Sequence, residues 1–323
     1  MGDRSFRTDL CDLFSIEHPI VLAGMGGVSM SDLVAAVSNA GGLGVIGAAM
    51  LGPDDLRREI RRTRELTDKP FAVDLLAPDP ERIRSHMKVI FDEKIEIFVA
   101  GLAVPDTFIA EMHERRMKVV VMCGKVRHAL KAAAAGADVV AAQGTEAGGH
   151  TGEVGTMALV PQVVDRVEVP VLAAGGIADG RGIAAALALG ARGAILGTRF
   201  IATQEAAAAP AYRQALVEAG EDSTVRTRCY TGKPARTIRN PYNAEWESRA
   251  REIQPFPMQV MESYRQGVMD YTGNSGDIDP ERSFMPAGQA LGLIDAVKPA
   301  AEIMAELVAE TSAALDRLGS MGA

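Results

Sequence analysis

The stretch PVLAAGGIADGRGIAAALALGARGAILGTRF, residues 170–200, contains one complete strand–helix–strand repeat and decides the fold. Its two apolar runs, 170–176 and 193–198, are short and lack polar alternation, which is typical of strands buried on both faces. Asp179 can cap the helix between them, and Gly190 can end it. This order of elements predicts two parallel strands joined by a crossover helix.

The same pattern recurs throughout residues 1–200. Most strand starts are spaced by roughly 20–30 residues, the size of a repeated βα unit. Eight such units favour an α/β fold of the (β/α)8 TIM-barrel type, and an open, doubly wound sheet of eight strands is the alternative. The predicted strands cover residues 19–24, 43–48, 70–76, 95–100, 117–122, 138–144, 170–176 and 193–198.

The repeat is lost after the eighth strand. Residues 221–286 are rich in Arg, Pro, Asn, Tyr and Met, and we expect a smaller, mostly helical insertion that covers the barrel mouth. Residues 298–318 have an amphipathic helical pattern and are expected to return as the last barrel helix; a dimerisation helix is the alternative. The predicted barrel domain therefore comprises residues 1–220 and 287–323.

The composition limits the classes of function. Lys and Arg number 34 against 42 Asp and Glu, a net charge of −8, which argues against a nucleic-acid surface. The three cysteines are far apart, which favours a reducing compartment over a disulfide scaffold. No secretory or membrane-spanning pattern is found. We expect a cytoplasmic, soluble protein, a monomer or a homodimer, without nucleic-acid or membrane partners.

Two glycine-rich loops follow the seventh and eighth strands, where barrels of this kind usually bind phosphate. Gly175 and Gly176 let backbone N–H groups approach a ligand, and Thr198 adds a hydroxyl. The helix that Asp179 caps would add the positive end of its dipole. Tight turns alone would also explain the glycines, but two such loops in adjacent positions favour a phosphate site.

The loop QGTEAGGHTGEVGT, residues 143–156, follows the sixth strand and contains five glycines and His150. Flexible loops on a rigid scaffold commonly carry function. His150 is the candidate catalytic residue, either as an acid or base near neutral pH or as a hydrogen-bonding group. A solvent-exposed loop histidine is the alternative. No histidines or cysteines have metal-ligand spacing, so no metal is expected.

The loop AGMGGVSM, residues 23–30, follows the first strand. Gly24, Gly26 and Gly27 leave room there for a flat ring against the backbone, although a tight turn would use the same residues. The sequence has no GxGxxG motif that opens a βα unit with an acidic residue at the right distance, so a Rossmann dinucleotide domain is not supported.

Six motifs occur in order from about Pro19 to about Ile303: PIVLAGMGG (19–27), QGTEAGGHTGE (143–153), PVLAAGGIADGRG (170–182), LGTRF (196–200), TGKPARTIRN (231–240) and PAGQALGLIDAVKPAAEI (286–303). Taken together, these motifs resemble the nitronate monooxygenase family, formerly called 2-nitropropane dioxygenases. The resemblance implies a flavin barrel with an inserted helical domain.

The resemblance also implies FMN as cofactor and His150 as the active-site histidine. The family usually has Asn at the end of the third strand, where this chain has Asp74, which either opposes flavin reduction by its charge or pairs with Lys125. The implied phosphate contacts are Gly176, Gly197 and Thr198, and the implied ring contacts are Gly24, Met25, Gln143 and Gly148.

Three functions compete. The first is nitronate monooxygenase, which uses O2 to convert an alkyl nitronate to a carbonyl compound and nitrite. The second is an NAD(P)H-dependent reductase of enoyl thioesters or quinones on the same scaffold. The third is a flavin-free barrel isomerase or lyase that binds a sugar phosphate. A basic patch would help the second function to bind an acidic carrier protein, and its candidate members are Arg226, Arg228, Lys233, Arg236 and Arg239.

Overall fold

A closed barrel of eight parallel strands forms the body of the protein, whose computed structural model describes residues 6–76, 80–103, 107–270, 272 and 278–321. The strands adjoin in the order β1, β9, β8, β6, β5, β4, β3, β2. Leu22 and Leu43 close the ring: the Leu22 N–H donates to Leu43 O at 2.9 Å, and the Leu43 N–H donates to Ile20 O at 2.9 Å. The predicted (β/α)8 barrel and its eight strands are therefore confirmed, and the open sheet is excluded. The strands are β1 (Ile20–Leu22), β2 (Gly44–Gly47), β3 (Phe71–Leu76), β4 (Ile97–Gly101), β5 (Lys118–Cys123), β6 (Val139–Gln143), β8 (Val171–Ala174) and β9 (Gly193–Leu196).

Two apolar cores account for the lack of polar alternation in the strands. Alternate residues such as Val45, Val99 and Leu172 fill the inside of the barrel, where Leu10 and Phe14 of α1 (Asp9–Phe14) join their cluster. The residues between them pack outward against the helices. Because both faces of each strand are covered, both sets of positions are apolar.

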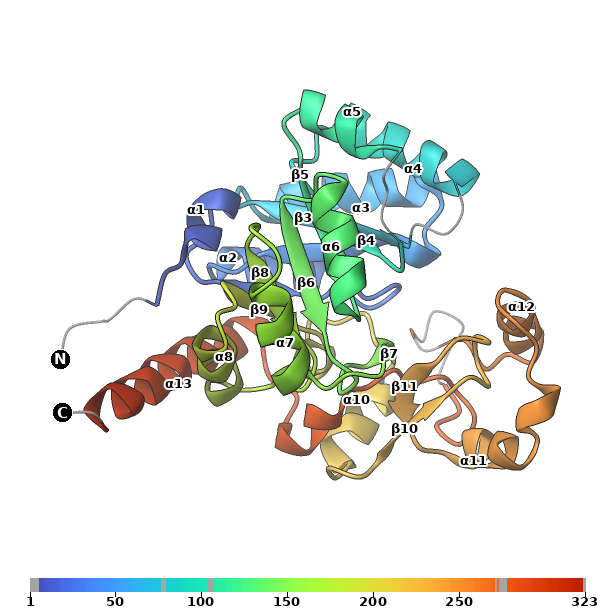
Figure 1. Ribbon diagram of the computed structural model, residues 1–323. Helices are drawn as coiled ribbons and strands as arrows, with labels where there is room; N and C mark the ends of the chain where they lie inside the picture. Colours follow the sequence, from blue (N-terminus) through green and yellow to red (C-terminus); the bar gives the residue numbers. More distant parts are fainter. Residues whose placement is uncertain (1–5, 77–79, 104–106, 271, 273–277, 322–323) are drawn as a thin grey trace.

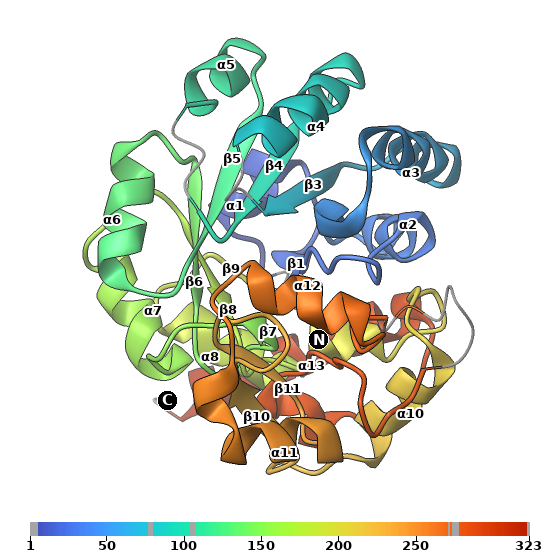
Figure 2. The ribbon, with the colours of Figure 1, turned by 90° about the vertical axis from the view of Figure 1, so that its right-hand side faces the viewer.

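The helices α2 to α8 and α13 surround the barrel as a ring (Figures 1 and 2). The C-terminal helix packs between α8 and α2 and so takes the eighth place, as predicted for residues 298–318. Asp179 caps α8 as predicted, because its side chain accepts the Gly182 N–H. The helices are α2 (Ser31–Asn39), α3 (Pro53–Leu66), α4 (Pro80–Asp92), α5 (Ile109–Glu114), α6 (Val126–Ala134), α7 (Thr156–Val164), α8 (Gly180–Ala188) and α13 (Ala300–Ser320).

The inserted segment lies over one side of the barrel opening, at the carboxyl ends of the strands (Figure 2). It contains the helices α11 (Pro241–Ser248) and α12 (Met258–Arg265), and also a β-hairpin that the sequence did not predict. The hairpin strands, β10 (Thr224–Thr227) and β11 (Ala235–Ile238), pair antiparallel. The remaining elements are short: η1 (Ala48–Met50), β7 (Gly149–His150), α9 (Thr198–Ile201), α10 (Pro210–Glu218), η2 (Ala250–Glu252) and η3 (Gln289–Leu293).

We expect Gly180→Ala to destabilise the fold, because α8 and α13 touch at this glycine. A Cβ atom there would lie 2.2 Å from the Thr311 backbone nitrogen and 2.4 Å from Glu310 Cβ. Overpacking of this kind costs about 1–3 kcal/mol, which would lower the midpoint of urea unfolding. Gly319→Ala, near the end of α13, is the control: no atom lies within 4 Å of its Cβ position, so the change should stabilise by up to about 1 kcal/mol. Equal midpoints for the two variants would contradict this account of the packing.

Candidate active site

A cavity of about 900 Å³ opens at the carboxyl ends of the strands, between the barrel and the insertion. Its walls come from the loops after β1, β6, β8 and β9, from inward-facing residues of the barrel strands and from α12. The predicted catalytic histidine and the predicted cofactor contacts line this one cavity, whereas Gly27, also expected beside a flat ring, does not. The lining residues are Gly24, Met25, Asp74, Gln143, Gly148, His150, Gly175, Gly176, Gly197 and Thr198.

The glycine loops at one end of the cavity present hydrogen-bond donors. Gly175 and Gly176 have φ values of +96° and +73°, which L side chains rarely adopt. Within the described chain, the N–H groups of Gly176 and Ile177 donate to no other protein group. Thr198 Oγ1 accepts the Gly288 N–H at 2.9 Å and so retains its own proton to donate. Such a cradle suits a small anion such as a phosphate monoester.

The N-terminus of α8 does not belong to this cradle, and the expectation that its dipole would help to hold a phosphate is wrong. Its N–H groups already face carboxylates: Gly180 donates to Glu310 Oε2 at 2.9 Å, and Gly182 donates to Asp179 Oδ1 at 3.1 Å. These negative charges offset the positive end of the dipole. Asp179 and Gly180 also lie outside the lining of the cavity.

The insertion fixes the position of His150. Strand β7 pairs antiparallel with β11, so that His150 is opposite Ala235 and Gly149 is opposite Arg236. Arg236 is buried, and its Nε donates to Thr145 O at 2.9 Å. The glycine-rich loop is therefore held by the insertion, and His150 is partly buried in the wall of the cavity instead of exposed on a free loop.

Thr231, to which sequence reasoning gave no role, determines the proton positions on His150. Thr231 Oγ1 lies 3.0 Å from His150 Nε2 and 3.0 Å from Lys233 O. A carbonyl oxygen only accepts, so the hydroxyl proton goes to Lys233 O, and Nε2 must donate to Thr231. Nδ1 is then the unprotonated nitrogen. Burial, and after it the charge of Lys233, lowers the pKa of His150 to about 4, so the ring is neutral at neutral pH.

Asp74 is buried at the end of β3. One of the two expectations was that it pairs with Lys125, and this expectation is wrong. Lys125 Nζ lies 3.3 Å from Glu153 Oε2 instead. Within the described residues, the Asp74 carboxyl group forms no hydrogen bond or ion pair. Burial raises the pKa of Asp74 to about 8. The other expectation was that the charge of Asp74 opposes flavin reduction. It assumed an ionised carboxylate, and the burial of Asp74 argues against that charge at neutral pH.

Three members of the expected basic patch, Arg226, Arg228 and Arg239, are exposed, and each already has a partner within the protein. Arg236 is buried, Arg239 Nη1 lies 3.5 Å from Glu247 Oε1, and Arg226 Nη1 donates to Gly152 O at 2.7 Å. Lys233 Nζ lies 4.3 Å from the centre of the Phe256 ring. These cations serve to hold the insertion together and to fasten it to the barrel loops.

The described residues also bear on membrane-spanning helices and on metal sites. No helix among them combines the length and the apolar character that crossing a bilayer requires. No group of three or more His, Cys, Asp or Glu side chains among them is arranged to hold a metal ion.

Comparisons with known proteins agree on one family. The family model described as nitronate monooxygenase matches residues 7–87 and 81–310. A probable nitronate monooxygenase of Staphylococcus saprophyticus is 37% identical over 78% of this chain and 84% of its own. The (3aS,4S,5R,7aS)-5-hydroxy-7a-methyl-1-oxo-octahydro-1H-indene-4-carboxyl-CoA dehydrogenase of Mycobacterium tuberculosis is 41% identical over 76% of this chain and 70% of its own.

Solved structures show the same arrangement over nearly the whole chain. FabK from Thermotoga maritima has a TM-score of 0.89 at 40% identity, covering 98% of this chain and 99% of its own. A nitroalkane oxidase from Streptomyces ansochromogenes has a TM-score of 0.86 at 32% identity, covering 96% of this chain and 99% of its own.

We expect Thr231→Val to allow both neutral tautomers of His150, because the valine side chain cannot accept a hydrogen bond from the Nε2–H group. Nitrogen-15 NMR of the imidazole should show a protonated Nε2 and a bare Nδ1 in the wild type, and a mixture of tautomers in the valine variant. Thr231→Ser keeps the hydroxyl and is the control that should resemble the wild type. A protonated Nδ1 in the wild type would contradict the hydrogen-bond direction inferred here.

Proposed function

Because the chain belongs to the nitronate monooxygenase family, we propose that it is an FMN-dependent enzyme that oxidises alkyl nitronates with O2 to a carbonyl compound and nitrite. Membership makes it an oxidoreductase on a (β/α)8 barrel. One observation carries the proposal: a neutral His150, held by the insertion, lies in the wall of the same cavity that the glycine loops line.

FMN fits the donors that the cavity offers. The free N–H groups at Gly176 and Ile177 and the Thr198 hydroxyl suit a single phosphate. Bound FMN would supply the electron transfer between the organic substrate and O2. In this proposal the barrel domain, residues 1–220 and 287–323, binds the cofactor. The insertion, residues 221–286, holds His150 and covers the cavity. Further contacts to the cofactor would come from Gly24, Met25, Asp74, Gln143, Gly148, Gly175 and Gly197.

The state of His150 indicates what it does for the substrate. Its Nδ1 is a proton acceptor, so it would take the α-proton of a neutral nitroalkane and leave the nitronate. A pKa of about 4 makes it a weak base. A preformed nitronate needs no such base, and the proposal therefore makes nitronates the better substrates.

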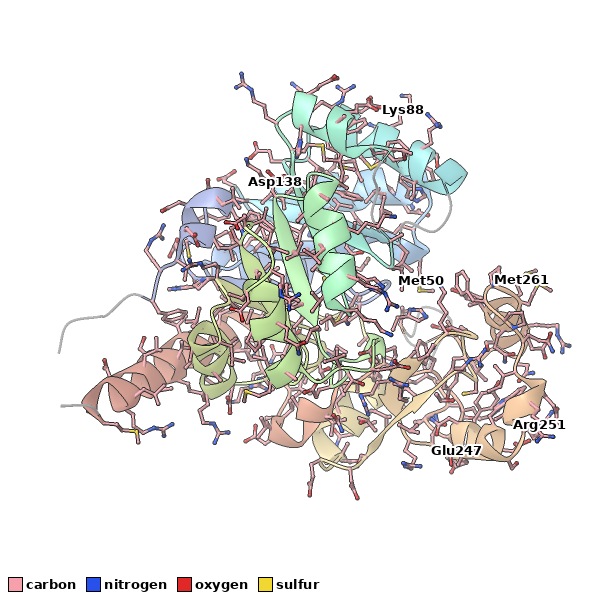
Figure 3. The ribbon with its side chains drawn as sticks, in the orientation of Figure 1. Met50, Lys88, Asp138, Glu247, Arg251 and Met261 are labelled. Carbon is pink, nitrogen blue, oxygen red and sulfur yellow. The ribbon has the colours of Figure 1, made fainter. Side chains whose placement is uncertain are left out.

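A second candidate function is oxidation or reduction of an acyl-CoA or enoyl thioester on the same site, and the apolar mouth of the cavity favours it. Met50, Leu76 and Tyr264 line the cavity and are nevertheless 37%, 36% and 50% exposed. Met50 lies at the barrel end that faces the insertion, and Met261 lies on α12 (Figure 3). Such a mouth suits a larger apolar substrate, and the Mycobacterium tuberculosis relative is named for a bicyclic carboxyl-CoA.

Anaerobic mixing separates these functions. We expect purified protein to show flavin absorbance, to release FMN on heating, and to lose its flavin absorbance when an alkyl nitronate is added without O2. Loss of absorbance with NAD(P)H or with a saturated acyl-CoA, and none with the nitronate, would replace the first candidate by the second. A protein without flavin after reconstitution, or one that releases FAD, would overturn the FMN assignment.

We expect His150→Ala to lower turnover of a neutral nitroalkane by about 10²–10⁴-fold, the usual range for loss of a general base, and to affect turnover of the preformed nitronate far less. Because the pKa of His150 is about 4, wild-type nitroalkane turnover should stay level from pH 7 to about 5 and fall below that as the base is protonated. Steady-state rates on both substrates test this. Equal losses on both would show that His150 only binds.

A further inference from the structure

Asp74 is an acidic side chain in the inner lining of a barrel that is otherwise apolar at this level. Inward positions alternate along β3, so Ala72 and Asp74 point inside, and Asp74 is paired with Gly47 on β2 and Val99 on β4. Asp74 is 8% exposed, and it lines the cavity. Its side chain is therefore one of the groups that a ring-shaped ligand in the cavity would touch.

Glycines confine Asp74 on both sides. A Cβ atom on Gly24 would lie 2.2 Å from Asp74 Cβ, and one on Gly101 would lie 3.4 Å from Asp74 Oδ1. The backbone at the ends of β1 and β4 thus encloses the carboxyl group, which leaves the cavity as the direction in which it can find a hydrogen-bond partner.

No described group neutralises a charge on Asp74. The neighbouring β2, β4, η1 and the loop 23–30 contain no titratable side chain. An unpaired ionised carboxylate in such a place costs far more than the neutral acid. Other nearby elements contain titratable groups, but each is exposed or has a partner. His86 is buried with its Nε2 2.8 Å from Leu51 O, His150 is bonded to Thr231, and Lys125 is paired with Glu153. The exposed groups are Arg84, Lys88 and Asp92 on α4 and Asp32 on α2.

We propose that Asp74 keeps its proton in the resting protein and donates that proton in a hydrogen bond to an acceptor atom of the flavin ring. This proposal rests on the function proposed above, because it requires a flavin in the cavity. A neutral carboxyl group can donate, whereas an ionised one only accepts. Burial raises the pKa of Asp74 to about 8, in agreement with a proton held at neutral pH.

The first test uses the protein without cofactor and measures unfolding against pH. The folded pKa is raised above its ordinary value of 3.8, so the proton stabilises the fold fully below about pH 4, and this stability is lost as the pH rises through about 8. The melting temperature of the wild type should therefore fall from pH 5 to pH 8 relative to Asp74→Asn. Glu153→Gln is the control: it makes the same change of a carboxyl group to an amide at an exposed residue and should keep the wild-type slope.

The second test measures FMN dissociation constants from pH 6 to pH 9 by quenching of flavin fluorescence. Wild type and Asp74→Asn, both donors at pH 6, should bind alike there, and wild type should bind about tenfold more weakly at pH 9. Asp74→Leu, which has no donor, should bind more weakly than Asp74→Asn at every pH. The FMN phosphate titrates near about pH 6 in all variants, so ratios between variants remove its contribution.

The outcomes separate this proposal from the function it rests on. Parallel melting curves, or FMN affinities whose ratio between wild type and Asp74→Asn does not change with pH, would overturn the role of Asp74 and leave the FMN assignment intact. Equal FMN affinity of the Leu and Asn variants would show that no hydrogen bond is donated. Failure of the wild type to bind FMN at any pH would overturn both.

Discussion

Closure of the sheet between Leu22 and Leu43 is the constraint on which the rest of this molecule depends. It removes the free edges of the sheet and buries every strand on two faces, which requires apolar residues at successive positions. It also gathers the carboxyl ends of all the strands around one opening. Gly24 and Thr198, far apart in the chain, therefore line one cavity. The site follows from closure, because no single segment of the chain contains it.

The sequence could predict what depends on local pattern and on closure. The eight strands, the return of α13 and the lining residues of the cavity followed from apolar runs, glycine loops and the geometry of barrels. The inward direction of Asp74 became known only from the structure, in which Ala72 belongs to the interior cluster. A strand that is apolar on both faces does not show in its sequence which residues point inside. The hairpin of β10 and β11 escaped prediction because its strands have four residues each and include Arg and Thr. The pairing that gives β11 its place, with β7, spans more than 80 residues of chain.

The error at α8 has the same physical origin. The helix and its cap at Asp179 are local and were predicted, but Glu310, which takes up the Gly180 N–H, is 130 residues away. A helix dipole is available to a ligand only where no carboxylate already faces it. The insertion likewise does more than cover the mouth. Through β7, Arg236 and Thr231 it fixes both the place and the proton positions of His150, so chemistry on the barrel depends on a segment outside it.

Asp74 and His150 show how one cause sets the charge of two side chains that line the cavity. Burial disfavours the charged form of either group, so it raises the pKa of the acid to about 8 and lowers that of the imidazole to about 4. Between these values both side chains are neutral, and one is left as a proton donor and the other as a proton acceptor. A cofactor that gains negative charge on reduction then meets no fixed carboxylate charge beside it in this pH range. Desolvation, which usually penalises polar groups, here keeps these two side chains uncharged and able to donate or accept a hydrogen bond.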